Sequence, residues 1–183
     1  SKIPALVDRD GPDGEEITVF ESASILLYLG EKFGRFVPTD PREKQEMYNW
    51  LFWQMGSAPY LGGGFGHFYK YAPEKFEYPI DRFTMEIKRL LDVLDRNLDK
   101  RRFLCGDDYN IADIATYAWY GNLVINNQYE AEEFIEAASY KNVVRWSTEI
   151  QERPAVRRGR RVNKVTGPEE MQLAERHAPS DLD

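Results

Sequence analysis

The sequence contains very few cysteine and histidine residues. Its one cysteine is Cys105, and its two histidines are His67 and His177. One cysteine cannot form an internal disulfide framework, and this composition suits a reducing cytoplasm. The two histidines match no metal-binding spacing, so a metal centre is not expected. Cys105 lies between Leu104 and Gly106, where we expect a buried and inert thiol.

Long apolar runs and an excess of positive charge are also missing. No stretch is long enough to cross a bilayer, so no membrane partner is expected. The formal net charge of −7 argues against a nucleic-acid partner, and we interpret the basic run 157–164 as solvated surface or as a source of salt bridges between subunits. The 183 residues, 42% of them hydrophobic, suit one compact domain or a small domain joined to a larger one.

The most informative segment that is present covers residues 19–29. A short apolar run stops there at Glu21 and Ser22, and an apolar helix follows. Ser22 is of a type that favours the N-cap position. A helix N-terminus presents free N–H groups and partial positive charge, so it can hold a carboxylate, and Glu21 can hold an ammonium group. The segment predicts a site for both ends of an α-amino acid; the alternative is that Ser22 only caps the helix and Glu21 only favours its dipole.

A second feature lies upstream, where Ile3 and Pro4 precede the apolar residues 5–7. Proline fits at the start of a strand, sometimes after a cis bond. A cis Ile3–Pro4 bond would turn the N–H and C=O of Ile3 outward to pair with an extended peptide; an ordinary trans proline is the alternative. Residues 10–14 are rich in turn formers, and 17–20 read as a returning strand. This region predicts a hairpin followed by a helix.

The rest of the chain predicts helices. Asn110 is placed to cap one of them, with Asp113 three positions later as in a capping box. Pro41 suits the first position of its helix, and Pro59 suits a helix end. The expected helices cover 22–32 (stopping near Gly34), 41–59, a long one from about 79 to 98, 110 to about 121, 130–138 and 141–153, and a polar tail follows from Arg157.

A segment rich in glycine and aromatic residues, 61–69, is expected to form a loop after Pro59, near the mouth of a substrate site. It lacks the Gly-Lys-Ser/Thr ending of a phosphate-binding loop, so nucleotide binding is not expected. The long helix that follows carries an apolar stripe, and Lys100, Arg101 and Arg102 would complement the dipole at its end. The stripe consists of Ile80, Phe83, Ile87, Leu90, Leu91, Leu94 and Leu98.

Taken together, these motifs resemble glutathione transferases. The second half of their thioredoxin-like domain has a similar order of motifs: Ile-Pro, a hairpin, Phe-Glu-Ser and an apolar helix. Residues 106–115 are similar to the helix-capping segment of their helical domain. The segments 49–53, 61–69 and 152–156 resemble the bacterial Nu class. The resemblance implies an α+β protein: the C-terminal half of a thioredoxin-like domain (1–35), a linker (36–40) and an all-α C-terminal domain with an extended tail (41–183).

The resemblance also implies a function and a set of site residues. It implies glutathione binding, a cytoplasmic homodimer and disulfide-bond reductase activity with weaker transferase or peroxidase activity. Ile3, next to Pro4, would pair through its backbone with the cysteinyl part of glutathione, and Glu21 and Ser22 would hold the γ-glutamyl end. The remaining expected contacts are Arg82 and Lys2 with the glycyl carboxylate, and Gln54. Two glutathione molecules in one site would supply both sulfurs, in agreement with the lone cysteine.

In this family a strand–helix–strand unit precedes the position of Ser1 and supplies the threonine or asparagine that contacts the glutathione sulfur. We therefore expect the catalytic group upstream of Ser1 and interpret the chain as a fragment rather than as a truncated relative. Two alternatives remain open. One is a non-catalytic binding or scaffold module, and the other is a conventional transferase that conjugates electrophiles.

Overall fold

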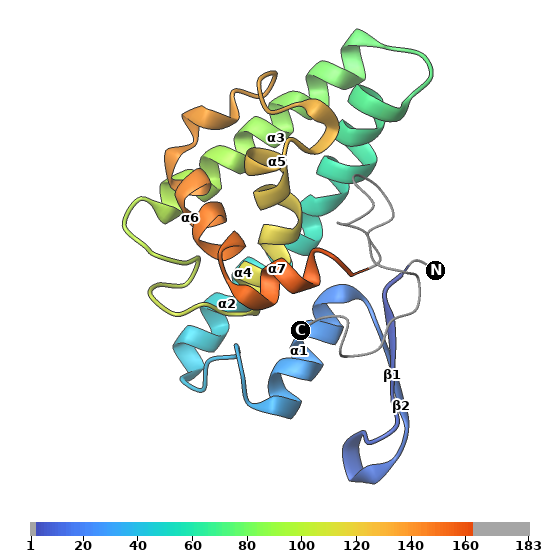
Figure 1. Ribbon diagram of the computed structural model, residues 1–183, viewed down its shortest axis with the longest axis vertical. Coiled ribbons are helices and arrows are strands. Elements are labelled where there is room, and N and C mark those ends of the chain that lie inside the picture. Colours follow the sequence, from blue (N-terminus) through green and yellow to red (C-terminus); the bar gives the residue numbers. More distant parts are fainter. Residues whose placement is uncertain (1–2, 163–183) are drawn as a thin grey trace.

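The computed structural model describes residues 3–162 and begins with the expected hairpin (Figure 1). Strand β1 (Ala5–Asp8) pairs antiparallel with β2 (Ile17–Phe20), with Ala5 opposite Phe20 and Asp8 opposite Ile17. A 3-10 turn over Pro12–Gly14 lies in the connection. Lys2 lies outside the described residues.

Helix α1 (Ser22–Phe33) ends as expected at Gly34, which adopts the left-handed conformation with φ 61°. Its start differs from the prediction. Ser22 is already the first helical residue, and Glu21 occupies the N-cap position with φ 69°, ψ 125° and no side-chain cap. The predicted N-cap role of Ser22 is therefore wrong. The reason is that β2 runs through Phe20 and leaves a single residue for the change of direction.

Helix α2 (Pro41–Pro59) begins as its sequence predicts. Pro41 is at the first helical position, and the side chain of Asp40 accepts hydrogen bonds from the backbone N–H groups of Arg42 and Glu43. The helix buries one stripe against the helical core: Met47, Leu51, Gln54 and Ala58, with Ser57 beside it.

The helical path does not stop at Pro59, and the expected loop is wrong. Residues Tyr60–Tyr71 continue as a π-helix. Gly64 and Gly66 explain the difference, because a Cβ there would lie 2.4 Å from a ring atom of Phe83 or of Tyr129. These glycines let aromatic rings pack directly on the backbone, so the segment is held by its neighbours rather than left as a loop.

Helix α3 (Glu77–Leu98) begins two residues before Pro79 and returns beside the π-helical segment (Figure 1). The predicted stripe is confirmed from Ile87 to Leu98, whose apolar residues are buried. The partner of the carbonyl groups at the end of α3 differs from the predicted Lys100, Arg101 and Arg102. Arg145 donates hydrogen bonds to the carbonyl oxygens of Leu98 and Arg101, at 3.1 and 2.8 Å. Arg101 itself pairs with Glu46.

The remaining helices come after the capping box in the chain. Asn110 and Asp113 form it as predicted at the start of α4 (Ile111–Thr116). The helix then passes through a π-helical turn (Tyr117–Gly121) into α5 (Asn122–Ile125), so it does not end at Gly121. Instead of a helix over 130–138 there are two 3-10 turns, Gln128–Glu130 and Ala137–Ser139. Helix α6 (Lys141–Gln151) and the unpredicted α7 (Pro154–Gly159) complete the described chain.

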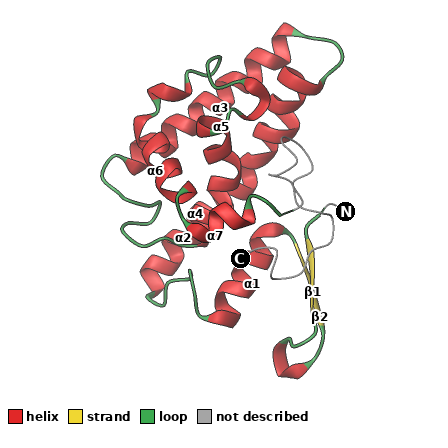
Figure 2. Ribbon diagram, viewed as in Figure 1, coloured by secondary structure: helices red, strands yellow, loops and turns green. Residues whose placement is uncertain are grey.

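The core lies among the helices. Its largest fully buried side chains include Trp146, Tyr120, Phe65 and Met47, whereas Val19 is the one buried residue of the two strands. Figure 2 shows the strands confined to one end of a mainly helical molecule, which confirms the expected α+β class. The domain boundaries at 35 and 40 stay predictions. None of the helices between residues 3 and 162 is both long and apolar enough to cross a membrane.

Candidate functional site

The two predicted backbone motifs lie at the same end of the hairpin. Because Ala5 pairs with Phe20, the residues just outside this pair, Pro4 and Glu21, lie at the open end of the two strands. The Ile3–Pro4 peptide bond is cis, and Ile3 is 94% exposed. The chain therefore brings Ile3, Glu21 and Ser22 to one edge of the molecule.

The N-terminus of α1 has free hydrogen-bond donors. The first bond inside the helix runs from the N–H of Ile25 to the carbonyl oxygen of Glu21, at 2.9 Å. The N–H groups of residues 22–24 therefore have no partner within the helix, and no side chain caps them. Among residues 3–162, the hydroxyl of Ser22 donates only to the thioether sulfur of Met55, at 3.8 Å. Thioether sulfur is a weak acceptor, so this junction can accept an anion with little competition from the part of the chain that is described.

Glu21 adopts a backbone conformation that is rare for a residue with a side chain. Its φ of 69° with ψ of 125° lies outside the usual regions, at a cost of order 1–3 kcal/mol. Such strain is often found where a side chain must be aimed at a ligand. Sequence reasoning missed this conformation; the available signal was the single residue between the strand and the helix.

On α2, the structure brings Met55 rather than Gln54 to this junction. Gln54 is fully buried on the core stripe, and neither its amide oxygen nor its nitrogen has a hydrogen-bond partner within the described chain. Successive side chains on a helix point about 100° apart. This explains why Gln54 faces the core whereas its neighbour Met55 faces Ser22. Gln54 thus lies in the core, and its contact with glutathione stays a prediction.

Arg82 lies on α3 and forms an ion cluster with Glu86 and Arg89. Its Nη1 is 3.7 Å from Oε2 of Glu86, and its side chain is 53% exposed. Glu86 is bound more closely by Arg89, at 2.5 Å, and this hydrogen bond lowers the pKa of the Glu86 carboxyl. Because one carboxylate faces two guanidinium groups, the cluster keeps a positive charge that suits an anion. Within residues 3–162 no hydrogen bond or ion pair joins Arg82 to Glu21 or Ser22.

The thiol and the described imidazole provide no nucleophile or metal site. Cys105 is half-buried rather than fully buried as predicted. The burial that it has raises the pKa of its thiol to about 12, so the thiol is protonated at neutral pH, and its lack of reactivity stays a prediction. The ring of His67 packs edge-on against Phe68, with centroids 4.9 Å apart. No group of three or more His, Cys, Asp or Glu is placed to hold a metal in the part of the chain that is described. His177 and Lys164 lie outside that part.

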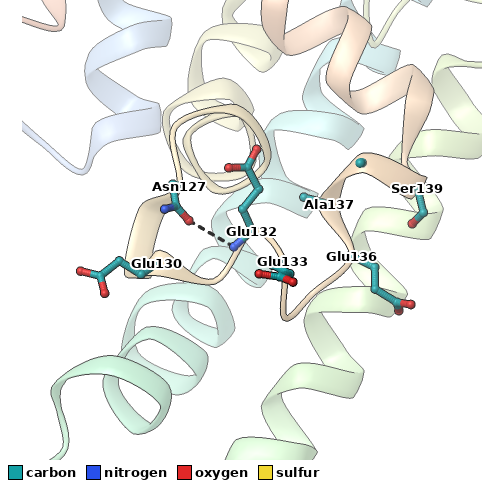
Figure 3. A pocket seen from close by; sticks show the side chains of 8 residues that line it. Asn127, Glu130, Glu132, Glu133, Glu136, Ala137 and Ser139 are labelled. Atoms are coloured by element: carbon teal, nitrogen blue, oxygen red, sulfur yellow. Dashed lines mark hydrogen bonds between the residues drawn. The ribbon is translucent and has the colours of Figure 1, made fainter.

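A separate cavity of about 580 Å³ is lined by residues of the connection from α5 to α6, four of which are glutamates (Figure 3). Glu130 pairs with Lys70, and Glu136 pairs with Lys88. The carboxylates of the four glutamates point in different directions in Figure 3 rather than toward one centre. This cavity therefore lacks the converging ligands of a cation site.

Comparisons with known proteins agree with the motifs. Residues 77–149 match the family described as glutathione S-transferase, C-terminal domain. All 183 residues align with the disulfide-bond oxidoreductase YghU of Escherichia coli at 59% identity, covering 63% of that protein.

The solved structures that are similar to this chain include two with bound glutathione. One is a glutathione transferase YghU from Streptococcus pneumoniae complexed with glutathione: TM-score 0.83, 59% identity, 86% of this chain and 60% of that one. The other is a glutathione transferase from Burkholderia graminis with two glutathione molecules bound per subunit: TM-score 0.84, 42% identity, 90% of this chain and 69% of that one. The chain thus spans about 60% of the length of the YghU proteins it matches.

Proposed function

This chain belongs to the glutathione S-transferase superfamily, and from that premise we propose that it is the glutathione-binding part of a disulfide-bond reductase. The single observation that carries the proposal is the junction of β2 and α1. There the uncapped helix start, the Ser22 hydroxyl and the Glu21 carboxylate share one edge with the exposed backbone of Ile3. Two relatives of known structure, one of them 59% identical, contain bound glutathione.

In the proposed complex the chain supplies binding and orientation. The γ-glutamyl carboxylate accepts hydrogen bonds from the N–H groups at the start of α1 and from Ser22, and Glu21 accepts from the γ-glutamyl ammonium group. The backbone of Ile3 pairs with the cysteinyl residue. Arg82 and Lys2 are the proposed partners of the glycyl carboxylate.

The reaction is thiol–disulfide exchange and needs no metal. The glutathione thiolate attacks one sulfur of a small disulfide, forms a mixed disulfide and releases the other sulfur as a thiolate. A second glutathione thiolate attacks the glutathione sulfur of the mixed disulfide, which yields oxidised glutathione and the second reduced thiol. Two bound glutathiones, as in the Burkholderia graminis structure, would allow this sequence without a protein cysteine. The proposed active form is a cytoplasmic homodimer.

The test is glutathione binding by calorimetry with the full-length protein and a Glu21→Gln/Ser22→Ala double variant. We expect the variant to lose glutathione binding while its circular dichroism spectrum and melting temperature stay close to those of the wild type. Ser24→Ala is the matched control, because Ser24 is an exposed serine in the same helical turn. Normal binding by the double variant would contradict the site.

Turnover of a small disulfide, compared with conjugation of an aromatic halide, tests the reaction. Reduction of the disulfide is the expected dominant activity. Dominant conjugation would indicate a conventional transferase, and glutathione binding without either activity would indicate a binding or scaffold module.

A further inference from the structure

The closed end of the hairpin is held on α1 by a polar cluster that the proposed site does not use. The carboxylate of Asp8, the last residue of β1, accepts hydrogen bonds from the hydroxyl of Tyr28 at 2.7 Å and from Nζ of Lys32 at 2.5 Å. Lys32 also donates to the backbone carbonyl of Asp10. Tyr28 and Lys32 are one helical turn apart on the same face of α1. Asp8, Tyr28 and Lys32 are referred to below as the Asp8 clamp.

The clamp joins the end of β1 to α1. Within the described chain, Val19 is the one buried residue among the eight strand residues. Beside the clamp a cavity of about 410 Å³ separates the hairpin turn from α1, with Tyr28 and Lys32 among its lining residues. At the closed end, polar contacts therefore join the hairpin to α1 beside this cavity.

The open end of the hairpin is joined to α1 by one residue, Glu21, in its unusual backbone conformation. A single joint allows two rigid elements to change their relative angle, because rotation at one φ/ψ pair is enough. The clamp adds a second attachment at the far end of β1, opposite Ile17. Two attachments at opposite ends of a four-residue strand pair fix the angle between hairpin and helix.

The charges in the clamp make it strong for a partly exposed contact. The side chains of Asp8 and Lys32 are 17% and 25% exposed. The hydrogen bonds from Lys32 and Tyr28 lower the pKa of Asp8 to about 2, so the carboxylate stays ionised at physiological pH. Asp10 differs, because its carboxylate is 92% exposed and 3.9 Å from the same lysine, where solvent screens the attraction.

We propose that Asp8 is a positioning residue for glutathione: through Tyr28 and Lys32 it fixes the angle between the hairpin, which carries Ile3, and α1, which carries Ser22. The proposal rests on the proposed function. Ile3 and Ser22 contact different parts of one ligand in that function, so their separation must match the length of glutathione. Asp8 touches neither the ligand nor the reacting sulfur, and its effect is on binding rather than on chemistry.

The experiment uses the full-length protein and compares Asp8→Asn with Asp10→Asn. Both substitutions remove one negative charge near Lys32, but only the first removes the carboxylate that Tyr28 and Lys32 share. Glutathione affinity is measured by calorimetry, and KM and kcat are measured for a small disulfide at varied glutathione. We expect Asp8→Asn to raise the Kd and the KM for glutathione about tenfold, the scale on which a small misplacement of binding groups acts. The kcat at saturating glutathione should stay within about twofold, and Asp10→Asn should match the wild type.

Loss of folded protein would lower the number of binding sites in the calorimetric titration without changing the Kd, which separates a purely structural role from positioning. Tyr28→Phe is the second variant, because it keeps the ion pair and removes one hydrogen bond; we expect about a threefold rise in Kd. An unchanged Kd in Asp8→Asn, or an equal rise of the Kd in Asp10→Asn, would overturn the positioning role. The proposed function would still stand in that case, provided that the wild-type protein binds glutathione. A wild-type protein that does not bind glutathione would overturn both.

Discussion

Replacement of Asp113 tests how much of the helical part depends on one buried carboxylate. Asp113 is completely buried. Its Oδ1 accepts hydrogen bonds from the backbone N–H of Leu104 at 3.0 Å and from Nε1 of Trp146 at 2.9 Å, and its Oδ2 accepts from the N–H of Asn110 at 3.1 Å. One side chain thus joins the start of α4, the segment before it and α6.

The size of the effect follows from these three donors. Asp113→Ala leaves three buried N–H groups without an acceptor, and each such group costs about 1–3 kcal/mol. Because the site relaxes in part, we expect a loss of about 4 kcal/mol in the free energy of unfolding. That is a large share of the 5–15 kcal/mol typical of a folded domain. Asp113→Asn keeps an acceptor for Leu104 and Trp146 but turns an amide toward the N–H of Asn110, so we expect about half the loss.

The loss should also depend on pH. Burial raises the pKa of Asp113 from its ordinary 3.8 to about 6, so between these values the folded state binds more protons than the unfolded state. Wild-type stability should therefore fall as the pH rises from about 4 to about 6, by about 2 kcal/mol from this group. Asp113→Asn has no such titration. The advantage of the wild type over Asp113→Asn should shrink as the pH rises.

The assay is urea denaturation followed by tryptophan fluorescence and far-ultraviolet circular dichroism between pH 4 and pH 7. Equal m-values would show that the variants unfold from equally compact states. Asp107→Asn is the control, because this nearby carboxylate is exposed. A loss below about 1 kcal/mol in Asp113→Ala, or a difference between wild type and Asp113→Asn that does not change with pH, would refute the reasoning.

Three further predictions concern packing, capping and reactivity. Gly64→Ala should lower stability by about 1–3 kcal/mol in urea denaturation, because the new Cβ would lie 2.4 Å from the ring of Phe83; Gly63→Ala, with nothing within 4 Å, is the control and should be neutral or stabilising. Asn110→Ala should cost about 1 kcal/mol through the lost cap on α4, with an unchanged glutathione Kd. Cys105 should react slowly with iodoacetamide at pH 8 in the folded protein and rapidly in denaturant, because burial raises its pKa to about 12; fast labelling of the native state, followed by mass spectrometry, would contradict this.

The sequence by itself determined the elements whose signals are local. Turn residues between two short apolar runs predicted the hairpin, and the structure has it in that place. Asn110 and Asp113 predicted a helix start because a capping box satisfies N–H groups within four residues of chain. The apolar stripe of α3 predicted which face is buried, because helical periodicity is a property of the segment alone. The β2–α1 junction was found in the same way.

Only the tertiary structure decided the features that depend on a distant partner. The chain continues as a helix past Pro59 because rings from elsewhere in the sequence pack on Gly64 and Gly66. Met55 rather than Gln54 contacts Ser22, because the packing of α2 decides which of these two adjacent side chains faces the core. The Asp8 clamp joins residues 20 and 24 positions apart. Local patterns state what a segment prefers, whereas these contacts arise only when packing places separate segments side by side.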